Sequence, residues 1–260
     1  MIVYPVESEI VKPGDIILDL LSKGLAKRHT RLRSGDIVAL SSKIVGISEN
    51  RIRTLDSVRP TREAVTLGRK YGLNPRFAQI VLDEADNVVG GVKGAILTVK
   101  NGDAVANAGI DQKNAPQNSV VLWPLNPERS ARLLRAAIKK RLGKRVGVVI
   151  VDSRVSPLRL GTTGFAIGAA GFKPTKDVRG ASDLSNRRVR ITLHAIADGI
   201  ASTAQLVMGE VAERVPFAVV RGAPATFGSY AGIQSAKLAW NRCLYMSQVT
   251  KPGKYNRNDS

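Results

Sequence analysis

The stretch from Asn126-Pro127-Glu128 to Val146-Gly147-Val148-Val149-Ile150-Val151-Asp152-Ser153 has the strongest pattern in the sequence. Its first three residues are typical of a helix start, with a capping side chain, a proline in the first turn and an early acid. Apolar residues then keep helical spacing up to Gly143, at positions 131, 134, 138 and 142. The apolar run that follows predicts a buried strand that ends at Asp152. A helix leading directly into a buried strand predicts a mixed α/β fold.

Outward from this unit, helix and strand signals alternate over most of the chain. We expect helices at residues 16–27, 61–71, 75–85 and 194–211, and strands at 36–45, 95–99, 104–108, 120–123 and 216–221. No internal repeat or linker separates them. The sequence therefore predicts a mixed α/β (α+β) fold in one domain, residues 1–248, which two subdomains could make up. A polar tail follows at residues 249–260.

Two acidic residues follow strand-like stretches of the sequence. Asp152-Ser153 follows the apolar run, and Asp111 lies in Ala106-Asn107-Ala108-Gly109-Ile110-Asp111-Gln112-Lys113-Asn114. Acids at the carboxyl ends of strands are well placed to hold a hard cation, and Mg²⁺ or Mn²⁺ commonly takes one or two carboxylates, a hydroxyl and phosphate oxygens. Each acid alone is as often a helix cap or a turn former. Together they favour a metal–phosphate site.

Composition limits the classes of protein. The 260 residues are 43% hydrophobic and 23% charged, enough to bury a full core. The single cysteine, Cys243, and the two histidines, His29 and His194, cannot supply a Cys/His zinc cluster, and no partner for thiol catalysis is evident. The start of the chain lacks a leader pattern, and no apolar run reaches about 18 residues. We expect a cytoplasmic protein that is not in a membrane.

The formal net charge is +19, from 40 Lys and Arg against 21 Asp and Glu. Such a charge attracts polyanions at low salt, so nucleic-acid binding is an alternative function. The basic residues are nevertheless scattered in several clusters, and only 5% of residues are aromatic, which leaves few stacking platforms. The charge suits small anionic ligands equally well.

A glycine-rich passage occupies residues 161–171. Glycines let backbone amides approach phosphate, but this passage matches neither the P-loop nor the dinucleotide fingerprint. Glycine at positions where backbones pack closely is the favoured interpretation.

Assembled in order, these segments resemble the coenzyme F420 gamma-glutamyl ligase family from about Tyr4 to Gly222. The resemblance is carried by Asn107-Ala108-Gly109-Ile110-Asp111 with Asn114, Asp152-Ser153, Gly164-Phe165-Ala166-Ile167-Gly168 with Gly171, Asp177 with Arg179-Gly180 and Asp183, and Leu206-Val207-Met208-Gly209-Glu210. The resemblance implies that family's own fold, an intertwined homodimer, and an enzyme that uses GTP to add L-glutamate to the lactyl carboxylate of the F420 precursor.

The resemblance also implies roles for individual residues. Two divalent cations, Mg²⁺ or Mn²⁺, would be held by Asp111, Asp152, Ser153 and Glu210, and K⁺ would be an optional further cofactor. Asp111, Asp152 and Arg159 would be catalytic. Contacts to GTP would come from Glu9, Ile10, Val11, Ser42, Lys43, Asn114, Met208, Gly209 and Arg214. The γ-phosphoryl group would pass to the substrate carboxylate, and the glutamate amine would then attack the acyl phosphate. Such chemistry depends on positioning and charge neutralisation and needs no protein nucleophile.

The sequence departs from the family pattern at three places. Ile47 replaces a lysine, Val155-Ser156-Pro157-Leu158-Arg159 replaces Gly-Arg-Pro-Trp-Arg, and Val211-Ala212-Glu213-Arg214 replaces a glycine-rich stretch. Two alternatives therefore stand beside the F420 ligase. One is a relative that ligates an amino acid to a different carboxylate, and the other is a non-catalytic basic protein on the same fold that binds nucleic acid.

Overall fold

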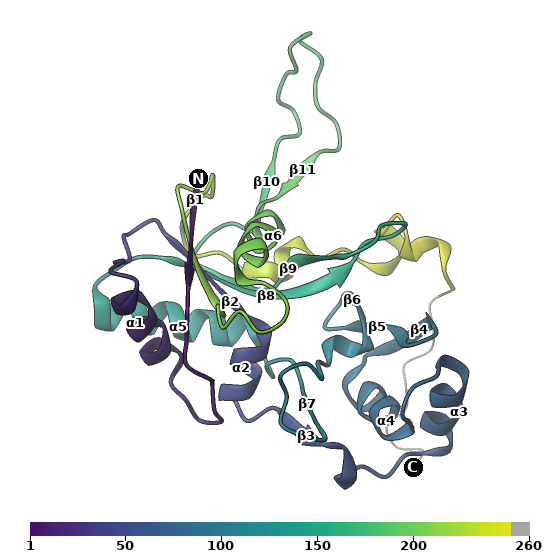
Figure 1. Cartoon of the computed structure of the whole chain (residues 1–260). Helices are drawn as coiled ribbons and strands as arrows, with labels where there is room; N and C mark the ends of the chain where they lie inside the picture. Colours follow the sequence, from purple (N-terminus) through teal and green to yellow (C-terminus); the bar gives the residue numbers. More distant parts are fainter. Residues whose placement is uncertain (251–260) are drawn as a thin grey trace. The chain divides into compact units, whose positions relative to one another are not determined.

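The computed structural model describes residues 1–250 and divides into two compact units, each built from separate stretches of the chain (Figure 1). The first unit comprises Met1–Glu49, Pro124–Ser153 and Thr162–Ala236, and the second comprises Asn50–Trp123, Arg154–Gly161 and the residues from Lys237 onward. The predicted tail lies outside the described residues from position 251 onward. The predicted mixed α/β class is confirmed.

A five-stranded sheet forms the centre of the first unit, in the order β1-β12-β2-β8-β9. Its strands are β1 (Ile2–Val6), β12 (Phe217–Arg221), β2 (Ile37–Ser41), β8 (Gly147–Val155) and β9 (Thr162–Ala170). β12 runs antiparallel to both β1 and β2, whereas β2 and β8 are parallel. Most of β2, β8 and β12 is buried, as expected for central strands rich in Val, Ile and Ala.

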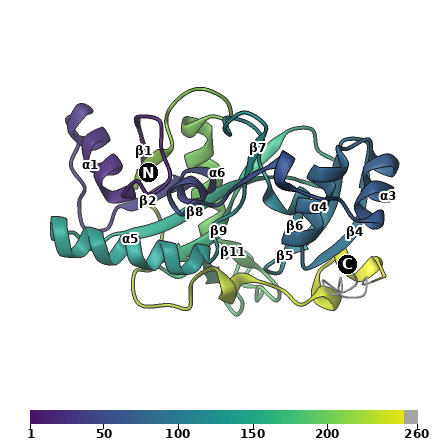
Figure 2. The same ribbon diagram turned by 90° about the horizontal axis from the view of Figure 1, so that it is seen from below.

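The helices of the first unit are α1 (Ile17–Lys27), α2 (Ser42–Ser48), α5 (Pro127–Leu142) and α6 (Ile196–Met208). α5 begins as predicted, because the Asn126 side chain accepts a hydrogen bond from the Arg129 N–H, and it ends at the left-handed Gly143. α1 and α5 lie at the same end of this unit (Figure 2), and Arg141 of α5 forms an ion pair with Asp19 of α1. The predicted helix at 16–27 is confirmed to within one residue.

Close packing explains the glycines of β9. A Cβ at Gly164 would lie 2.5 Å from the carbonyl oxygen of Ala201 in α6, and one at Gly168 would lie 2.6 Å from the carbonyl oxygen of Pro127 in α5. The helices therefore reach β9 only because these positions lack side chains. The interpretation of the glycine-rich passage as a packing feature is confirmed at Gly164 and Gly168, whereas nothing lies within 4 Å of a Cβ at Gly161.

A buried ion pair joins the ends of two strands in the first unit. The Asp36 carboxylate, 1% exposed, accepts hydrogen bonds from Nε and Nη2 of Arg221, both at 2.8 Å. Asp36 precedes β2 and Arg221 ends β12, so the pair fixes the register of these neighbours. The guanidinium also lies 5.0 Å from the Tyr4 ring centroid of β1.

Several predicted boundaries are wrong. The strand predicted at 36–45 ends at Ser41, because the Ser41 side chain accepts the Lys43 N–H and starts α2. The strand predicted to end at Asp152 continues to Val155, since a backbone ladder with β9 does not require buried side chains. The helix predicted at 194–211 starts at Ile196, because Leu193–Ala195 forms β11, and it ends at Met208, because Gly209 leaves the helical conformation.

β11 pairs antiparallel with β10 (Thr175–Asp177) in an arm that the sequence pattern did not predict. Figure 1 shows the arm projecting from the neighbourhood of α6. Backbone hydrogen bonds continue along it beyond the strands, between Gly180 and Val189 and between Ala181 and Val189. Its turn is closed by Asp183, whose Oδ1 accepts from the Ser185 and Arg187 N–H groups.

The second unit contains a three-stranded meander, a two-stranded ribbon and two helices. The meander is β4 (Asn87–Val92), β5 (Ala95–Lys100) and β6 (Asp103–Ala106), and the ribbon pairs β3 (Ile52–Thr54) with β7 (Ser119–Val121). The helices α3 (Arg62–Tyr71) and α4 (Pro75–Glu84) are capped by Thr61 and Asn74. Both were predicted to within one residue. The predicted strand at 104–108 ends early, at Ala106, because the next three residues take left-handed conformations.

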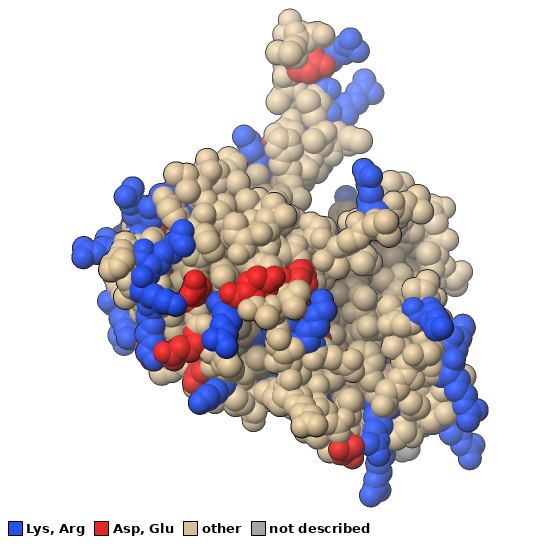
Figure 3. All heavy atoms as spheres, viewed as in Figure 1, with Lys and Arg blue, Asp and Glu red and all other residues tan. Residues whose placement is uncertain are grey.

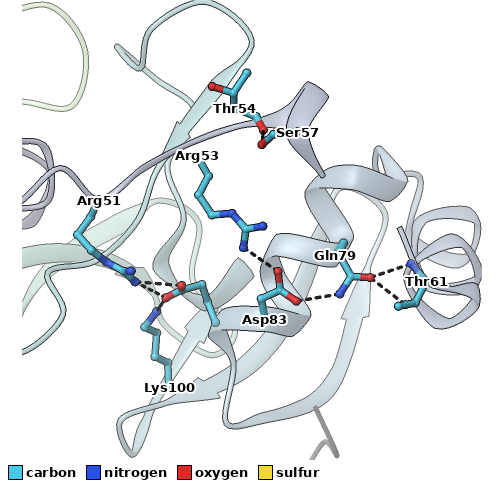
Figure 4. Close-up of polar contacts among 9 residues, drawn as sticks. Arg51, Arg53, Thr54, Ser57, Thr61, Gln79, Asp83 and Lys100 are labelled. Atoms are coloured by element: carbon cyan, nitrogen blue, oxygen red, sulfur yellow. Dashed lines mark hydrogen bonds and ion pairs between the residues drawn. The ribbon is translucent and has the colours of Figure 1, made fainter. Parts of the chain in front are cut away.

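Buried charges form a network in the second unit. Figure 4 shows Arg51 and Lys100 directed at one carboxylate, which belongs to Glu84. Burial is the largest influence on Glu84 and raises its pKa, but the Lys100 and Arg51 cations together outweigh burial, so the pKa of Glu84 is lowered. A second chain of contacts links Arg53, Asp83, Gln79 and Thr61 (Figure 4). These contacts connect β3 and β5 to α4.

The face drawn in Figure 3 shows Lys and Arg spread over both units and the β10–β11 arm, with Asp and Glu among them. Within residues 1–250, no helix has the length and apolar character needed to cross a membrane.

Candidate active site

One edge of the first unit's sheet collects most of the predicted site residues. The register aligns Val6 of β1 with Phe217 of β12, Phe217 with Leu40 of β2, and Leu40 with Ile150 of β8. The segments that hold the predicted residues lie just beyond this row. They are Glu9–Val11 after β1, Ser42 and Lys43 after β2, Asp152 and Ser153 at the end of the buried part of β8, and Arg214 before β12.

Two backbone hydrogen bonds tie these segments together. The Ser8 N–H donates to the Arg214 carbonyl at 3.0 Å, and the Ser41 N–H donates to the Pro216 carbonyl at 3.0 Å. The first bond places the start of the Glu9–Val11 segment beside the turn that holds Arg214. The second places Ser42 beside the same turn. Sequence spacing alone could not show this, because 206 residues separate Ser8 from Arg214 and 175 residues separate Ser41 from Pro216.

Asp152 and Ser153 lie inside β8, at the point where its residues change from buried to half-buried. The Asp152 Oδ1 atom accepts the Ser153 N–H at 2.8 Å, which restrains the carboxylate against the backbone. The predicted residues are therefore at a sheet edge, although the strand does not end there.

Glu210 lies two residues after α6, which ends at Met208 and is followed by Gly209 with a φ of 74°. Its Oε1 atom accepts from the Gln205 Nε2 and, at 3.3 Å, from the Thr162 hydroxyl. Thr162 is the first residue of β9, the strand next to β8. Glu210 is therefore linked to the strand that neighbours Asp152 and Ser153. Gln205 and Thr162 were not singled out from the sequence, since only the packing of α6 on β9 reveals their contact with Glu210.

The turn after α6 is organised by Glu213. Its carboxylate accepts the Val211 N–H at 2.8 Å and the Glu210 N–H at 3.4 Å. Hydrogen bonds from backbone N–H groups, its own first and that of Val211 second, lower the pKa of Glu213. Gly209 has a φ of 74° and a ψ of −174°, a backbone conformation essentially confined to glycine, so position 209 requires glycine. Arg214 then takes a φ of 56°, and Met208 is buried.

A cavity of about 440 Å³ adjoins the predicted Glu9–Val11 segment. Glu9 and Ile10 line it together with Lys12, with residues of α1 and with Arg141 of α5. Lys23 of α1 lies 3.6 Å from the Glu9 carboxylate. The cavity therefore combines charges of both signs and belongs entirely to the first unit.

The remaining predicted residues belong to the second unit. Asp111 forms a β-bridge with Val121, and its Oδ1 atom accepts the Lys113 N–H at 2.6 Å. Asn114 is exposed and has a φ of 58°. Arg159 is exposed, and its N–H donates to the Ser156 carbonyl at 3.2 Å. Asp111, Asn114 and Arg159 therefore belong to the second unit and the other predicted site residues to the first. Each unit holds both a predicted cation ligand and a predicted nucleotide contact.

Among the side chains of residues 1–250, no three His, Cys, Asp or Glu are grouped as a metal site. The donor types nevertheless suit a hard cation, because the first unit offers the Asp152 and Glu210 carboxylates and the Ser153 hydroxyl on linked elements. Mg²⁺ and Mn²⁺ take oxygen ligands of this kind and leave further positions for water or phosphate.

Comparison with known proteins gives consistent matches. The family described as F420-0:Gamma-glutamyl ligase matches residues 5–222. The chain is 36% identical to the coenzyme F420:L-glutamate ligase of Methanopyrus kandleri, over 87% of this chain and 88% of that protein. The corresponding figures are 38%, 85% and 87% for the protein of the same name from Archaeoglobus fulgidus, and 39%, 77% and 81% for that from Methanocaldococcus jannaschii. The match over most of the chain, with the ordered segments above, means that the chain belongs to the F420-0:gamma-glutamyl ligase family.

Proposed function

We propose that this protein is an amide-forming ligase that adds L-glutamate to the carboxylate of the coenzyme F420 precursor, with GTP as the phosphoryl donor. One observation carries the proposal beyond family membership. The register of the first unit's sheet gathers Glu9–Val11, Ser42 and Lys43, Asp152 and Ser153, and Arg214 at one edge, as a shared nucleotide site requires.

Each proposed role follows from the chemistry of the side chain. Asp152, Ser153 and Glu210 hold one or more divalent cations, Mg²⁺ or Mn²⁺, and Asp111 of the second unit has the same role. When bound, these cations neutralise phosphate charge and make the γ-phosphoryl group a better electrophile. Lys43 and Arg214 add fixed positive charge for the phosphates, with Met208, Gly209 and Asn114 as further nucleotide contacts. Arg159 neutralises the substrate carboxylate.

The reaction proceeds in two balanced steps. An oxygen of the precursor carboxylate attacks the γ-phosphorus of GTP, so that GDP leaves and an acyl phosphate forms. The neutral amine of L-glutamate then attacks the acyl carbon, phosphate leaves, and the amine loses a proton. No protein nucleophile takes part, so the protein's contribution is positioning and charge neutralisation.

A second candidate is ligation to a different carboxylate. The segment around Ser156 departs from the family pattern and exposes Val155, Leu158 and Leu160 to solvent, with Leu158 at a φ of 57°. An apolar loop of this kind favours an acceptor other than the phosphodiester-bearing F420 precursor. The nucleotide and cation roles would be unchanged.

Mass spectrometry of a ligation assay separates these candidates. Purified protein with the F420 precursor, L-glutamate, GTP and Mn²⁺ or Mg²⁺ should yield a product heavier by one glutamate residue. Asp152→Asn should reduce the rate by about 100-fold or more, as expected when a metal-binding carboxylate loses its charge. Its amide oxygen can still accept the Ser153 N–H, so the urea midpoint should change little.

Asp56→Asn is the matched control, because Asp56 contacts Arg76 and Asn118 and belongs to no proposed site. Equal loss in both variants would refute a specific role for Asp152. Metal-dependent GTP binding without product would favour the different acceptor. Salt-sensitive RNA binding without GTP binding would favour the nucleic-acid alternative.

We also propose that the protein acts in the cytoplasm as an intertwined homodimer. Light scattering coupled to size exclusion should then give twice the chain mass of 27.9 kDa. A single-chain mass at assay concentration would contradict the dimer.

A further inference from the structure

Three successive residues of the second unit have left-handed backbone conformations. Asn107, Ala108 and Gly109 have φ values of 51°, 54° and 71°. Glycine and asparagine tolerate this region, but alanine has no side chain that could compensate for the unfavourable conformation. A left-handed alanine persists only where its surroundings fix it. The turn Asn107–Gly109 connects β6 to Asp111.

Hydrogen bonds from β5 hold one side of this turn. The buried Thr98 hydroxyl accepts the Ala108 N–H at 2.9 Å and donates to the Val105 carbonyl at 2.8 Å. The Asn107 Oδ1 atom accepts the Ile96 N–H at 2.8 Å. Thr98 and Ala108 are both fully buried, so these bonds have no competition from water.

An indole ring covers the other side. A Cβ at Gly109 would lie 2.1 to 2.7 Å from three atoms of the Trp123 ring, and Trp123 itself is 1% exposed. The Trp123 carbonyl accepts from the Arg51 Nε at 3.2 Å, and the Lys100 ammonium lies 5.9 Å from the ring centroid. Arg51 and Lys100 are held in turn by the carboxylate shown in Figure 4. Trp123 is therefore held in place by two cations whose own positions are fixed by Glu84.

Asp111 follows directly from this fixed turn. The Ile110 N–H donates to the Asn107 carbonyl at 3.0 Å, and the Ile110 side chain is buried. Asp111 then exchanges two backbone hydrogen bonds with Val121, at 3.0 and 2.8 Å. Its backbone is thus fixed from both directions, which leaves the carboxylate only its side-chain rotations.

We propose that Thr98 is a positioning residue for Asp111, acting through the left-handed turn Asn107–Gly109. The inference rests on the proposed function, in which Asp111 holds a divalent cation. If Thr98 had only a structural role, loosening the turn would affect folding but would leave cation binding by the folded protein unchanged. A positioning role predicts that loosening the turn weakens cation binding in protein that remains folded.

The test titrates Mn²⁺ into the full chain and measures free Mn²⁺ by electron paramagnetic resonance. Thr98→Val keeps the side-chain shape but removes the acceptor for the Ala108 N–H, and it should raise the Mn²⁺ dissociation constant by about tenfold. Thr98→Ser restores the hydroxyl and should stay within about twofold of the unmodified protein. A urea titration of each variant verifies that it is folded during the measurement.

Asn101→Gly is the matched control. Asn101 has a φ of 52° and lies before β6, whereas the turn Asn107–Gly109 lies after it. This change alters a left-handed residue of the same meander without touching the Thr98 contacts, so Mn²⁺ affinity should not change. If Thr98→Val does not fold, Asn107→Gly replaces it, because glycine accepts the positive φ and removes only the acceptor for the Ile96 N–H.

The outcomes separate this inference from the proposed function. Weaker Mn²⁺ binding in Thr98→Val, restored in Thr98→Ser, supports positioning. Unchanged Mn²⁺ affinity in folded Thr98→Val, with loss of affinity in Asp111→Asn, overturns the positioning role alone. Unchanged affinity in Asp111→Asn overturns the cation role of Asp111 and the inference with it.

Discussion

Asp111 and Asp152 show what a sequence reveals about single residues. Both were predicted as cation ligands from residue type and family resemblance. In both, the Oδ1 atom accepts a backbone N–H from a residue that follows it, Lys113 for Asp111 and Ser153 for Asp152. The partners that orient Glu210 were not predicted. Gln205 is only five residues away and fits many roles, while Thr162 is 48 residues away and meets Glu210 only because α6 packs on β9.

The structure changes what is expected of a lysine at position 47. The family pattern has lysine here, which suggests that Ile47→Lys would add a phosphate contact. Ile47 is instead only 9% exposed, in α2. We expect Ile47→Lys to lower the free energy of unfolding by about 2–3 kcal/mol, because an ammonium would lose its hydration without a partner. Urea denaturation measures this loss.

Ile191→Lys is the control for that experiment, since Ile191 is 85% exposed and the same change there should be nearly neutral. Equal stability of the two variants would show that position 47 admits a hydrated lysine. A lower KM for GTP in Ile47→Lys would then revive the phosphate contact.

At the scale of elements, local signals predicted the capped helices well. α3, α4 and α5 each begin at a Thr or Asn cap and carry an apolar face, so their bounds follow from nearby residues. Predictions failed where two patterns overlap. Ile44 and Val45 extend the apolar run of β2 but belong to α2, because one side-chain hydrogen bond at Ser41 redirects the chain. The β10–β11 arm has mostly exposed residues and no periodic apolar signal.

The contact between β9 and α5 gives a prediction about packing. Gly168→Ala should lower the free energy of unfolding by about 2 kcal/mol, because the added methyl would overlap the backbone of Pro127. Gly90→Ala in β4 is matched, since nothing lies within 4 Å of a Cβ there. Its effect should stay within about 1 kcal/mol. Chemical denaturation measures the free energy of unfolding of both variants. Equal losses of stability would mean that α5 shifts to accommodate the methyl group at no cost.

The β10–β11 arm gives a prediction about pH. Hydrogen bonds from the Arg179 side chain, and then from its backbone N–H, lower the pKa of Asp177 from 3.8 to about 2. Because the folded-state pKa is depressed, the pair contributes its full stabilisation above the unfolded-state pKa and loses it as pH falls toward about 2.

Nuclear magnetic resonance of the Asp177 carboxyl carbon should therefore show a midpoint near 2 in the native protein and a higher midpoint in Arg179→Ala. A midpoint near 3.8 in the native protein would mean that the ion pair does not persist in solution.

At the scale of the whole molecule, the sequence predicted the fold class and the family but not the grouping of residues. Each compact unit combines stretches from distant parts of the chain, so Pro124–Ser153 joins Met1–Glu49 while Asn50–Trp123 forms the other unit. Local sequence patterns cannot reveal which stretches share a unit, because that grouping depends on which strands pair. β2 pairs with β8, which is more than 100 residues away, and this pairing aligns the sheet edge that carries the candidate site.

The net charge of +19 allows a test that involves the whole surface. If the charge serves to attract anionic substrates, the KM for GTP should rise about threefold or more between 50 and 500 mM KCl, since screening shortens the range of attraction from roughly 14 Å to roughly 4 Å. kcat should stay nearly constant, because contacts in the bound state are short and screened little. Steady-state kinetics across this salt series measures both constants. A fall in kcat at constant KM would instead indicate that salt disturbs a bound cation or the fold, and the charge would then have no role in substrate capture.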